Sequence, residues 1–543
     1  MWKKHPKALP FLFFSEMWER FGYYLMIGIF TLYLKDVKAG FAMTEAESAD
    51  LYGTFIALVF LTPFLGGLIA DRYWGYRKSI IIGGLLMGAG YLLMSVHSLP
   101  VLYLSMTLVI VGNGFFKPNI STLLGNVYTT PEHNHQKDEG YNIFYMGINV
   151  GAFICNFFGA VLYNTLGWGY AFAAAGIGMF LGVLIFLIGT RHYKAYDVKK
   201  GMKEGDMSML RITGLILFPS VIAGVLGWLL PGNIFGSDST DAFIFACIPV
   251  ILFYASLYFR AQKEDKAPVG VLLIIFAVVV MFWAVFKQNG SALTTWADRY
   301  TDRSVTGTTE QLFGAVQLTQ TLKYQKDSVA LYDEQFRLQK KDGQVVKEWN
   351  YPLYFRNDAS TKMQTDGNTL SVWSTNLSQS INPGWVILLT PLVVAFFTWL
   401  RRKGKEPGTP TKIAFGLLIS ALSVLVMVAA SKAGNNGAEK VSVWWLIASY
   451  GVITVGELLL SPMGLSLVSK LSPAHITSLM MGGWFLATSI GNKLSGILAS
   501  MWDRYEDKSN FFWLNFVLLL AAAGVLFLLL KQLNKVMKER GIV

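Results

Sequence analysis

The sequence predicts an all-α integral membrane protein in which two bundles of six transmembrane helices flank two additional helices. Only 15% of the 543 residues are charged and 53% are hydrophobic, whereas soluble domains carry about 25% charged residues. Apolar runs of about 18 residues or more recur along the chain, and each is long enough to cross about 30 Å of hydrocarbon as a helix. Fourteen such runs produce the arrangement of six, two and six.

The fourteen runs follow one another with short connections, apart from one long polar loop. The first run carries charged residues and lacks a small-residue cleavage site, so we expect a retained helix rather than a signal peptide. An even number of spans places both termini on one side of the membrane. Lys and Arg concentrate in the short loops on that side, so both termini are expected in the cytoplasm. The runs cover residues 9–34, 50–70, 79–96, 100–124, 141–163, 168–190, 211–231, 241–259, 268–294, 383–400, 412–431, 442–468, 475–500 and 510–531.

Three units are predicted along the chain. Residues 1–190 form an N-terminal six-helix bundle, residues 191–267 a cytoplasmic linker with the two inserted helices, and residues 268–543 a C-terminal six-helix bundle. The inserted helices carry no charged residue between Arg211 and Asp238. We therefore expect them to be lipid-facing additions rather than parts of a pathway.

The polar loop at about 296–382 interrupts the C-terminal bundle. By the count of spans it lies on the side opposite the termini, and it contains strand-like pieces such as WNYPLYF. Two interpretations remain open for this loop: a small β-rich subdomain, or a partly ordered connection.

Composition also excludes several classes of function. The net charge of +12 comes from basic residues in alternate short loops, which indicates membrane orientation in a lipid bilayer rather than nucleic-acid binding. Cys155 and Cys247 both lie in apolar runs, so neither a disulfide nor a cysteine metal site is expected, and no other metal site is predicted. Without a P-loop or a nucleophile–base motif, the chain is not expected to be an enzyme. The sequence leaves its oligomeric state open.

The first apolar run contains an unusual polar face. In EMWERFGYY, Glu16, Glu19, Arg20 and Tyr23 are spaced i, i+3, i+4 and i+7, so all four lie on one face of a helix. Charge at bilayer depth costs a few kcal/mol per residue on insertion scales. This face therefore has to contact protein or a water-filled cavity, and the cavity predicts a transport site.

Three other runs each contain an isolated ionisable residue. Lys117 lies in GNGFFKPNI, Lys287 in FWAVFKQNGS and Glu457 in GELLLSPMG. Together with the first run, these make three acids and three bases, which allows full internal neutralisation. Each group could belong to a fixed ion pair that only joins helices, but six ionisable groups on four spans favour a pathway.

The connection between the second and third runs, GGLIADRYWGYRKS, resembles the cytoplasmic loop signature of the major facilitator superfamily. The resemblance implies that Asp71 and Arg72 make a loop-to-helix contact that differs between conformations. The alternative is an ordinary turn with juxtamembrane charges. Two bundles of six helices are also the layout of that superfamily, whose substrate site lies near the midplane between the halves.

EMWERFGYY resembles the first-helix signature E-x-x-E-R-F-x-Y-Y of the proton-dependent oligopeptide transporter family. FFKPNIS, FYMGINVGA, FWAVFKQNGS, GELLLSP and SIGNKLSG follow in the order of that family, so the resemblance covers all twelve core helices. The two inserted helices are similar to those of bacterial members. The resemblance implies a proton-coupled importer of di- and tripeptides in the cell (inner) membrane, with small peptides as partners, protons as the coupling ion and no other cofactor.

The resemblance also implies roles for individual residues. Arg20 and Lys117 match the cations that receive the carboxylate of a peptide. Glu457 matches the acid that receives its amino terminus and pairs with Lys117 as an inner gate. Glu16 and Glu19 match the carboxylates that couple to protons together with Arg20. Further cavity residues that contact the peptide are expected at Tyr23, Tyr24, Asn149, Asn382 and Trp484.

The chain departs from the family at an outer-gate pair. Ile27 and Lys287 stand where the family usually has an arginine and an acid. By offset, Glu45 and Arg299 form a reversed second pair, so we expect the outer gate to rest on them and Lys287 to face the cavity as part of the substrate site. An importer of another peptide-like or organic-anion substrate is the alternative. A drug–proton antiporter and a membrane enzyme are less favoured alternatives.

Overall fold

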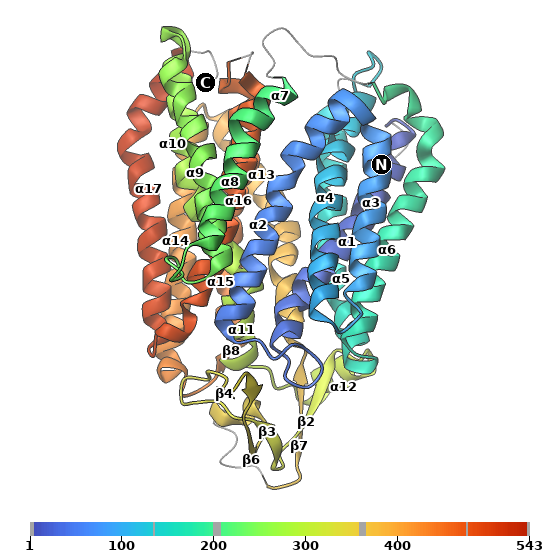
Figure 1. Cartoon of the computed structure of the whole chain (residues 1–543), viewed down its shortest axis with the longest axis vertical. Helices are drawn as coiled ribbons and strands as arrows, with labels where there is room; N and C mark the ends of the chain where they lie inside the picture. The colour runs from blue at the N-terminus through green and yellow to red at the C-terminus, as the bar shows by residue number, and fades with distance from the viewer. Residues whose placement is uncertain (1–4, 134–135, 199–207, 358–364, 474–475, 540–543) are drawn as a thin grey trace.

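A computed structural model of the chain describes residues 5–133, 136–198, 208–357, 365–473 and 476–539. Helices form two bundles that stand side by side (Figure 1). The N-terminal bundle consists of α1 (Ala8–Lys35), α2 (Glu45–Ile69), α3 (Tyr76–Leu93), α4 (Leu99–Val127), α5 (Lys137–Thr165) and α6 (Trp168–Gly189). The C-terminal bundle consists of α10 (Lys263–Phe286), α13 (Ile381–Arg402), α14 (Thr409–Ala433), α15 (Val443–Leu471), α16 (Thr477–Ser500) and α17 (Lys508–Glu539).

The inserted unit contains the short α7 (Met209–Ile212), a π-helical turn at Thr213–Leu217, α8 (Phe218–Leu229) and α9 (Asp238–Arg260). A helix therefore lies at each of the fourteen predicted runs. Within the described ranges, ten helical segments are long and apolar enough by composition to cross a bilayer. The major facilitator fold predicted from the six, two and six pattern is the observed fold.

The run predicted at 268–294 differs from the observed structure. Its helix α10 begins at Lys263, so it crosses the predicted boundary between residues 267 and 268, and it ends at Phe286. A 3-10 turn at Lys287–Gly290 follows, and α11 (Ala292–Arg299) then continues toward the loop. Lys287 therefore lies at the end of α10 rather than inside a helix. Ser291, with φ −132° and ψ −93°, separates the 3-10 turn from α11.

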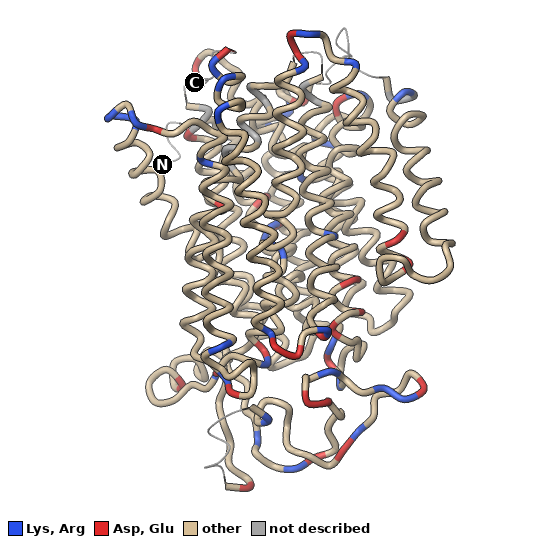
Figure 2. The backbone as a smooth tube through the Cα atoms, turned by 90° about the vertical axis from the view of Figure 1, so that its left-hand side faces the viewer, with Lys and Arg blue, Asp and Glu red and all other residues tan. Residues whose placement is uncertain are grey.

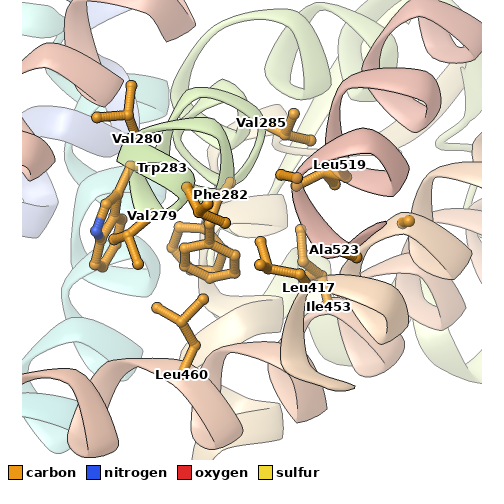
Figure 3. Close-up of a cluster of buried hydrophobic side chains, with 14 of the residues drawn as sticks. Val279, Val280, Phe282, Trp283, Val285, Leu417, Ile453, Leu460, Leu519 and Ala523 are labelled. Atoms are coloured by element: carbon orange, nitrogen blue, oxygen red, sulfur yellow. The ribbon is translucent and has the colours of Figure 1, made fainter. Parts of the chain in front are cut away.

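Each bundle has its own apolar core. In the C-terminal bundle, Val279 and Phe282 of α10 face Leu417 of α14, Leu460 of α15 and Leu519 of α17 (Figure 3). The core of the N-terminal bundle is formed in the same way by α1 to α6. Charged residues gather at the two ends of the molecule and are sparse along the helical middle (Figure 2).

The polar loop contains short paired strands, as one of its two interpretations predicted. We call residues 301–373 the β-subdomain. It lies at the end of the molecule opposite the two termini (Figure 1), and we refer to these as the β-subdomain end and the termini end. Its elements are β1 (Thr301–Asp302), α12 (Gly307–Ala315), β2 (Thr319–Lys323), β3 (Asp327–Ala330), β4 (Lys340–Lys341), β5 (Gln344–Val345), β6 (Lys347–Asn350) and β7 (Thr369–Trp373).

The strands pair two by two, and one pairing anchors the β-subdomain to the helices. β2 pairs with β7 and β3 with β6, both antiparallel, and β4 pairs with β5 in a tight hairpin. β1 pairs in parallel with β8 (Val441–Ser442), which directly precedes α15. The loop is therefore fixed to the C-terminal bundle at the β-subdomain end.

Candidate functional site

The polar face of α1 is buried and internally paired. Arg20 Nε lies 3.1 Å from Glu16 Oε1 and also forms an ion pair with Glu19. All three residues are at most 3% exposed. One guanidinium thus serves two carboxylates, and Arg20 Nη2 has no hydrogen-bond partner among the described residues. The trio carries a formal charge of −1, which favours binding of a cation or a proton.

Two cations from opposite halves contact the same aromatic ring. Lys117 Nζ of α4 lies 4.1 Å from the ring centroid of Phe60, and Lys287 Nζ lies 5.1 Å from the same centroid. Both distances are in the range of cation–π attraction. Both lysines are only partly buried. Lys287 therefore contacts a ring of the opposite bundle, and its predicted place in the substrate site stays a prediction.

Glu457 of α15 is held by an amide from the neighbouring helix α13. Asn382 Nδ2 donates to Glu457 Oε2 at 3.1 Å and to Thr454 Oγ1 at 2.9 Å. Lys287 is within electrostatic range of Glu457. Among the contacts of the described residues, Lys117 is not paired with Glu457 in this conformation. The predicted Lys117–Glu457 gate stays a prediction about another conformation.

The remaining predicted cavity residues differ in their accessibility. Tyr24 and Asn149 are partly exposed, whereas Tyr23 is buried and packs edge-on against Tyr24. Trp484 is 3% exposed and packs against Gly464 of α15, so in this conformation it lies inside the C-terminal bundle. Tyr145, which sequence reasoning missed, is 46% exposed and within electrostatic range of Glu457 and Tyr24.

The signal for Tyr145 was present in the motif FYMGINVGA. Tyr145 precedes Asn149 by four residues, and Asn149 Nδ2 donates to its carbonyl oxygen at 3.0 Å. Residues four apart lie on one face of a helix, so Tyr145 and Asn149 lie on the same face of α5.

Glu45 is the centre of a charged cluster at the β-subdomain end. Arg299 Nη2 lies 3.8 Å from Glu45 Oε2, so the sequence-predicted pair is in contact. Lys35, which the sequence did not indicate, is closer: its Nζ lies 3.1 Å from the same oxygen and 2.7 Å from Thr295 Oγ1. Thr295 also donates to Glu45 Oε1 at 2.7 Å. Glu45 thus links α1, α2 and α11.

Further polar contacts join the bundles at the same end. Thr31 donates to the carbonyl oxygen of Gly290 at 2.9 Å, and Asn156 donates to Ser380 Oγ at 3.1 Å. Asn164 donates to Ser374 Oγ at 2.6 Å. Together with the Glu45 cluster, these contacts close the space between the bundles toward the β-subdomain end.

The loop between α2 and α3 forms a π-helical turn at Ala70–Trp74. Asp71 accepts a hydrogen bond from the hydroxyl of Tyr76 at 2.5 Å. Asp197, after α6, accepts from the backbone N–H groups of Tyr76 and Arg77 at 2.7 and 3.3 Å. Asp71 and Arg72 thus lie at the termini end in an ordered turn, and their predicted role in conformational change stays a prediction.

The fold and the charged residues between its halves define a multi-pass membrane transporter. The model of the POT family (PTR2) matches residues 77–316 and 358–514. The chain therefore belongs to the POT family.

Relatives and solved structures agree with this assignment. The uncharacterized transporter YclF of Bacillus subtilis is 27% identical over 541 residues, covering 98% of this chain and 95% of the relative. Dipeptide and tripeptide permease A of Salmonella typhimurium is 28% identical over 511 residues, covering 93% and 86%. A crystal structure of a mutant of peptide transporter POT in complex with alafosfalin superposes with a TM-score of 0.75 at 25% identity, covering 99% and 97%.

Proposed function

We propose that this chain is a proton-coupled symporter that imports di- and tripeptides by alternating access. The observation that carries the proposal is the distribution of charge between the bundles. Arg20, Lys117 and Lys287 supply cations, while Glu457, held by Asn382, supplies an acid on the C-terminal side. A small peptide is a zwitterion, and it needs opposite charges held apart in a shared cavity.

In this proposal the carboxylate of a peptide binds to Lys117 and to the free edge of Arg20. The amino terminus binds to Glu457 in place of the amide of Asn382. Contacts to the peptide backbone and side chains come from Tyr23, Tyr24, Tyr145, Asn149 and Asn382, and Trp484 would have to move to reach the peptide. The names of relatives, which include a dipeptide and tripeptide permease, support the same substrate class.

Proton coupling is assigned to the trio on α1. Two carboxylates share one guanidinium, so a proton on Glu16 or Glu19 neutralises the trio and leaves Arg20 with one anionic partner instead of two. Arg20 is then more available to the carboxylate of the peptide. Proton binding and peptide binding would reinforce each other through this shared cation. No cofactor besides the proton is required.

The arrangement in the membrane follows from the positive-inside distribution. We place both termini and the Asp71–Arg72 turn in the cytoplasm, and the β-subdomain outside an inner membrane. Closure at the β-subdomain end then corresponds to a closed outer side. Opening that side requires the Glu45 cluster to separate, and the Lys117–Glu457 pair would close the inner side in exchange. The proposal assigns no enzymatic activity to the chain.

A second candidate substrate is favoured by one observation. Lys287 lies beside Lys117 over the ring of Phe60, so the cavity holds an additional cation. A peptide with an acidic side chain, or another organic anion, would gain from this position. Replacing Lys287 by Glu should shift competition from acidic toward basic dipeptides, and an unchanged profile would remove Lys287 from the site.

Uptake of labelled dialanine by proteoliposomes, with and without an inward proton gradient, tests the main proposal. We expect the gradient to drive accumulation and a proton ionophore to abolish it. Lys117→Ala should reduce driven uptake at least tenfold, because about 1.4 kcal/mol of lost binding already costs a factor of ten. Lys535→Ala, at an exposed site on α17, is the matched control and should leave uptake unchanged. Gradient-independent uptake, or wild-type uptake by Lys117→Ala, would contradict the proposal.

A further inference from the structure

A second ion pair joins the two bundles away from the Glu45 cluster. Lys493 of α16 lies with its Nζ 2.6 Å from Asp50 Oδ1 of α2, and it also donates to Thr54 Oγ1 at 2.6 Å. The side chain of Lys493 is 1% exposed and that of Asp50 is 23% exposed. The sequence positions are 443 apart, and no local pattern indicated this contact.

The inserted helix α9 supplies two further hydrogen-bond donors to the Asp50 carboxylate. Ser239 donates to Asp50 Oδ2 at 2.5 Å and Thr240 donates to Asp50 Oδ1 at 2.9 Å. Both residues lie in the first turn of α9, which is capped by the Ser237 hydroxyl. The N-terminus of a helix favours negative charge because its N–H groups are unpaired. Asp50 is therefore bound jointly by the C-terminal bundle and by the inserted unit.

The ion pair lies about one helical turn from a close backbone approach between the bundles. A Cβ placed on Gly53 of α2 would lie 2.6 Å from Cα of Gly496 in α16, so the two backbones touch. One and two turns nearer the membrane centre, Asn492 donates to the carbonyl oxygen of Ile56 at 3.3 Å and Ser489 to that of Ala57 at 2.7 Å. Opening of this end has to separate α2 from α16 along this line.

The free-energy cost of breaking this ion pair depends on the conformation of the transporter. While the end is closed, removing one partner of the buried pair leaves the other charge buried without a counter-charge, which is strongly unfavourable. When the end opens, water reaches both charges and most of that cost disappears. Apolar residues at positions 50 and 493 would favour closure, but the conformation would not change the cost of a buried charge.

We propose that Asp50 and Lys493 form a further outer gate of this transporter, and that the inserted helices hold it closed through Ser239 and Thr240. This inference rests on the proposed alternating access, because it assigns the pair to the step in which the outer side opens. It gives the inserted unit a part in transport, whereas the sequence indicated only lipid-facing additions. Figure 1 shows α8 and α9 lying along the edge where α2 and α16 meet.

Distances between spin labels test the gate directly. Ala39→Cys and Asn510→Cys place labels on exposed residues at the β-subdomain end of the two bundles, in a chain whose Cys155 and Cys247 are replaced by Ala. Double electron–electron resonance in proteoliposomes then reports a short distance for the closed end and a long one for the open end. We expect Lys493→Met and Asp50→Asn each to raise the ratio of long to short distances at least threefold.

A double-mutant cycle separates an ion pair from two independent effects. The chain carrying both Lys493→Met and Asp50→Asn should shift the ratio no further than the larger single change. Additive shifts, or no shift in either single variant, would overturn the gate. Lys535→Met breaks an exposed pair within α17, with Nζ 3.9 Å from Glu539 Oε1, and should leave the ratio unchanged.

The inserted helices are tested by Ser239→Ala combined with Thr240→Val. This variant should raise the ratio when Asp50 is present and have no effect in the Asp50→Asn chain; an unchanged ratio in both chains would overturn the role of α9. Dialanine uptake by the unsubstituted chain separates the two proposals. If uptake fails while the ratio responds to Lys493→Met, the result supports the gate and contradicts the proposed peptide substrate. If uptake is driven by protons and the ratio does not respond to Lys493→Met, only the proposed gate is contradicted.

Discussion

Phe60 brings two lysines of opposite bundles onto one ring, and this arrangement concentrates positive charge between the bundles. Lys117 and Lys287 repel one another, but each gains from the negative face of the aromatic ring. Glu457 is within electrostatic range of Lys287 and is oriented by Asn382. Under the proposed function, a peptide carboxylate in this space would meet two ammonium groups, while its amino group would meet one carboxylate.

At Gly53 the structure predicts a large effect of one added methyl group. Gly53→Ala places a Cβ 2.6 Å from Gly496 Cα, which forces α2 and α16 apart. Overpacking of this kind costs about 1–3 kcal/mol. We expect a lower melting temperature in detergent by several degrees and a more open β-subdomain end.

Gly524→Ala is the matched control for this substitution. Gly524 is a helical glycine of α17 with nothing within 4 Å of an added Cβ, and alanine in a helix is favoured over glycine by up to about 1 kcal/mol. Its melting temperature should stay the same or rise. Equal melting temperatures for Gly53→Ala and the unsubstituted chain would show that α2 and α16 can adjust without cost.

Among the elements, the 3-10 turn at Trp502–Arg504 between α16 and α17 carries an acid in an unusual environment. Burial and the nearby Glu45 carboxylate together raise the pKa of Asp503 to about 6, although Arg299 opposes the shift. Asp503 Oδ1 has no hydrogen-bond partner among the described residues. The turn therefore adds a titratable group to the Glu45 cluster.

The pH dependence of stability follows from this pKa. An unfolded Asp titrates near 3.9, so folding takes up a proton between about pH 4 and pH 6. The stability contributed by Asp503 is present below about pH 4 and is lost as the pH rises through 6. Between pH 4.5 and pH 7.5, the free energy of unfolding of Asp503→Asn should therefore rise by about 2 kcal/mol relative to that of the unsubstituted chain. Melting curves of both chains across this range measure the difference, and parallel curves would place Asp503 in contact with water.

For the whole molecule, closure at one end depends on a few shared residues. Glu45 accepts from Lys35 and Thr295 and pairs with Arg299, so it serves two cations. Loss of the acid removes the carboxylate from both cations, whereas loss of either cation leaves one ion pair intact. Substitution of Glu45 should therefore weaken the cluster more than substitution of Lys35 or Arg299.

A charge swap tests this asymmetry. Glu45→Gln should impair gradient-driven uptake more than Arg299→Gln, because it removes two ion pairs instead of one. Exchanging the charges with Glu45→Arg and Arg299→Glu should restore uptake only in part, since Lys35 then lies beside a new arginine. Addition of Lys35→Gln to the exchanged chain should improve the rescue. Full rescue by the two changes alone would show that Lys35 contributes nothing to the gate.

The sequence alone determined the helices, their order and the face of α1 that carries charge. Apolar runs and i, i+4 spacing are local properties, and the hydrocarbon core allows few backbone arrangements other than a helix. The motif EMWERFGYY and those that follow also indicated the family, which the comparisons confirm. The contact between Glu45 and Arg299 was predicted because offsets from known motifs carry over between relatives of one fold.

Apart from the pair of Glu45 and Arg299, only the tertiary structure decided which charged side chains meet. Lys35 joins Glu45, Asp50 joins Lys493, and Lys117 lies on Phe60 rather than against Glu457. The Asp50–Lys493 contact joins residues 443 positions apart, so it depends on the relative tilt and height of α2 and α16 and on which end of the molecule is closed. No local spacing encodes either quantity, because each helix forms its own backbone hydrogen bonds whatever its neighbours are. The inserted helices show this most clearly: their apolar sequence indicated contact with lipid, and packing placed the first turn of α9 on Asp50.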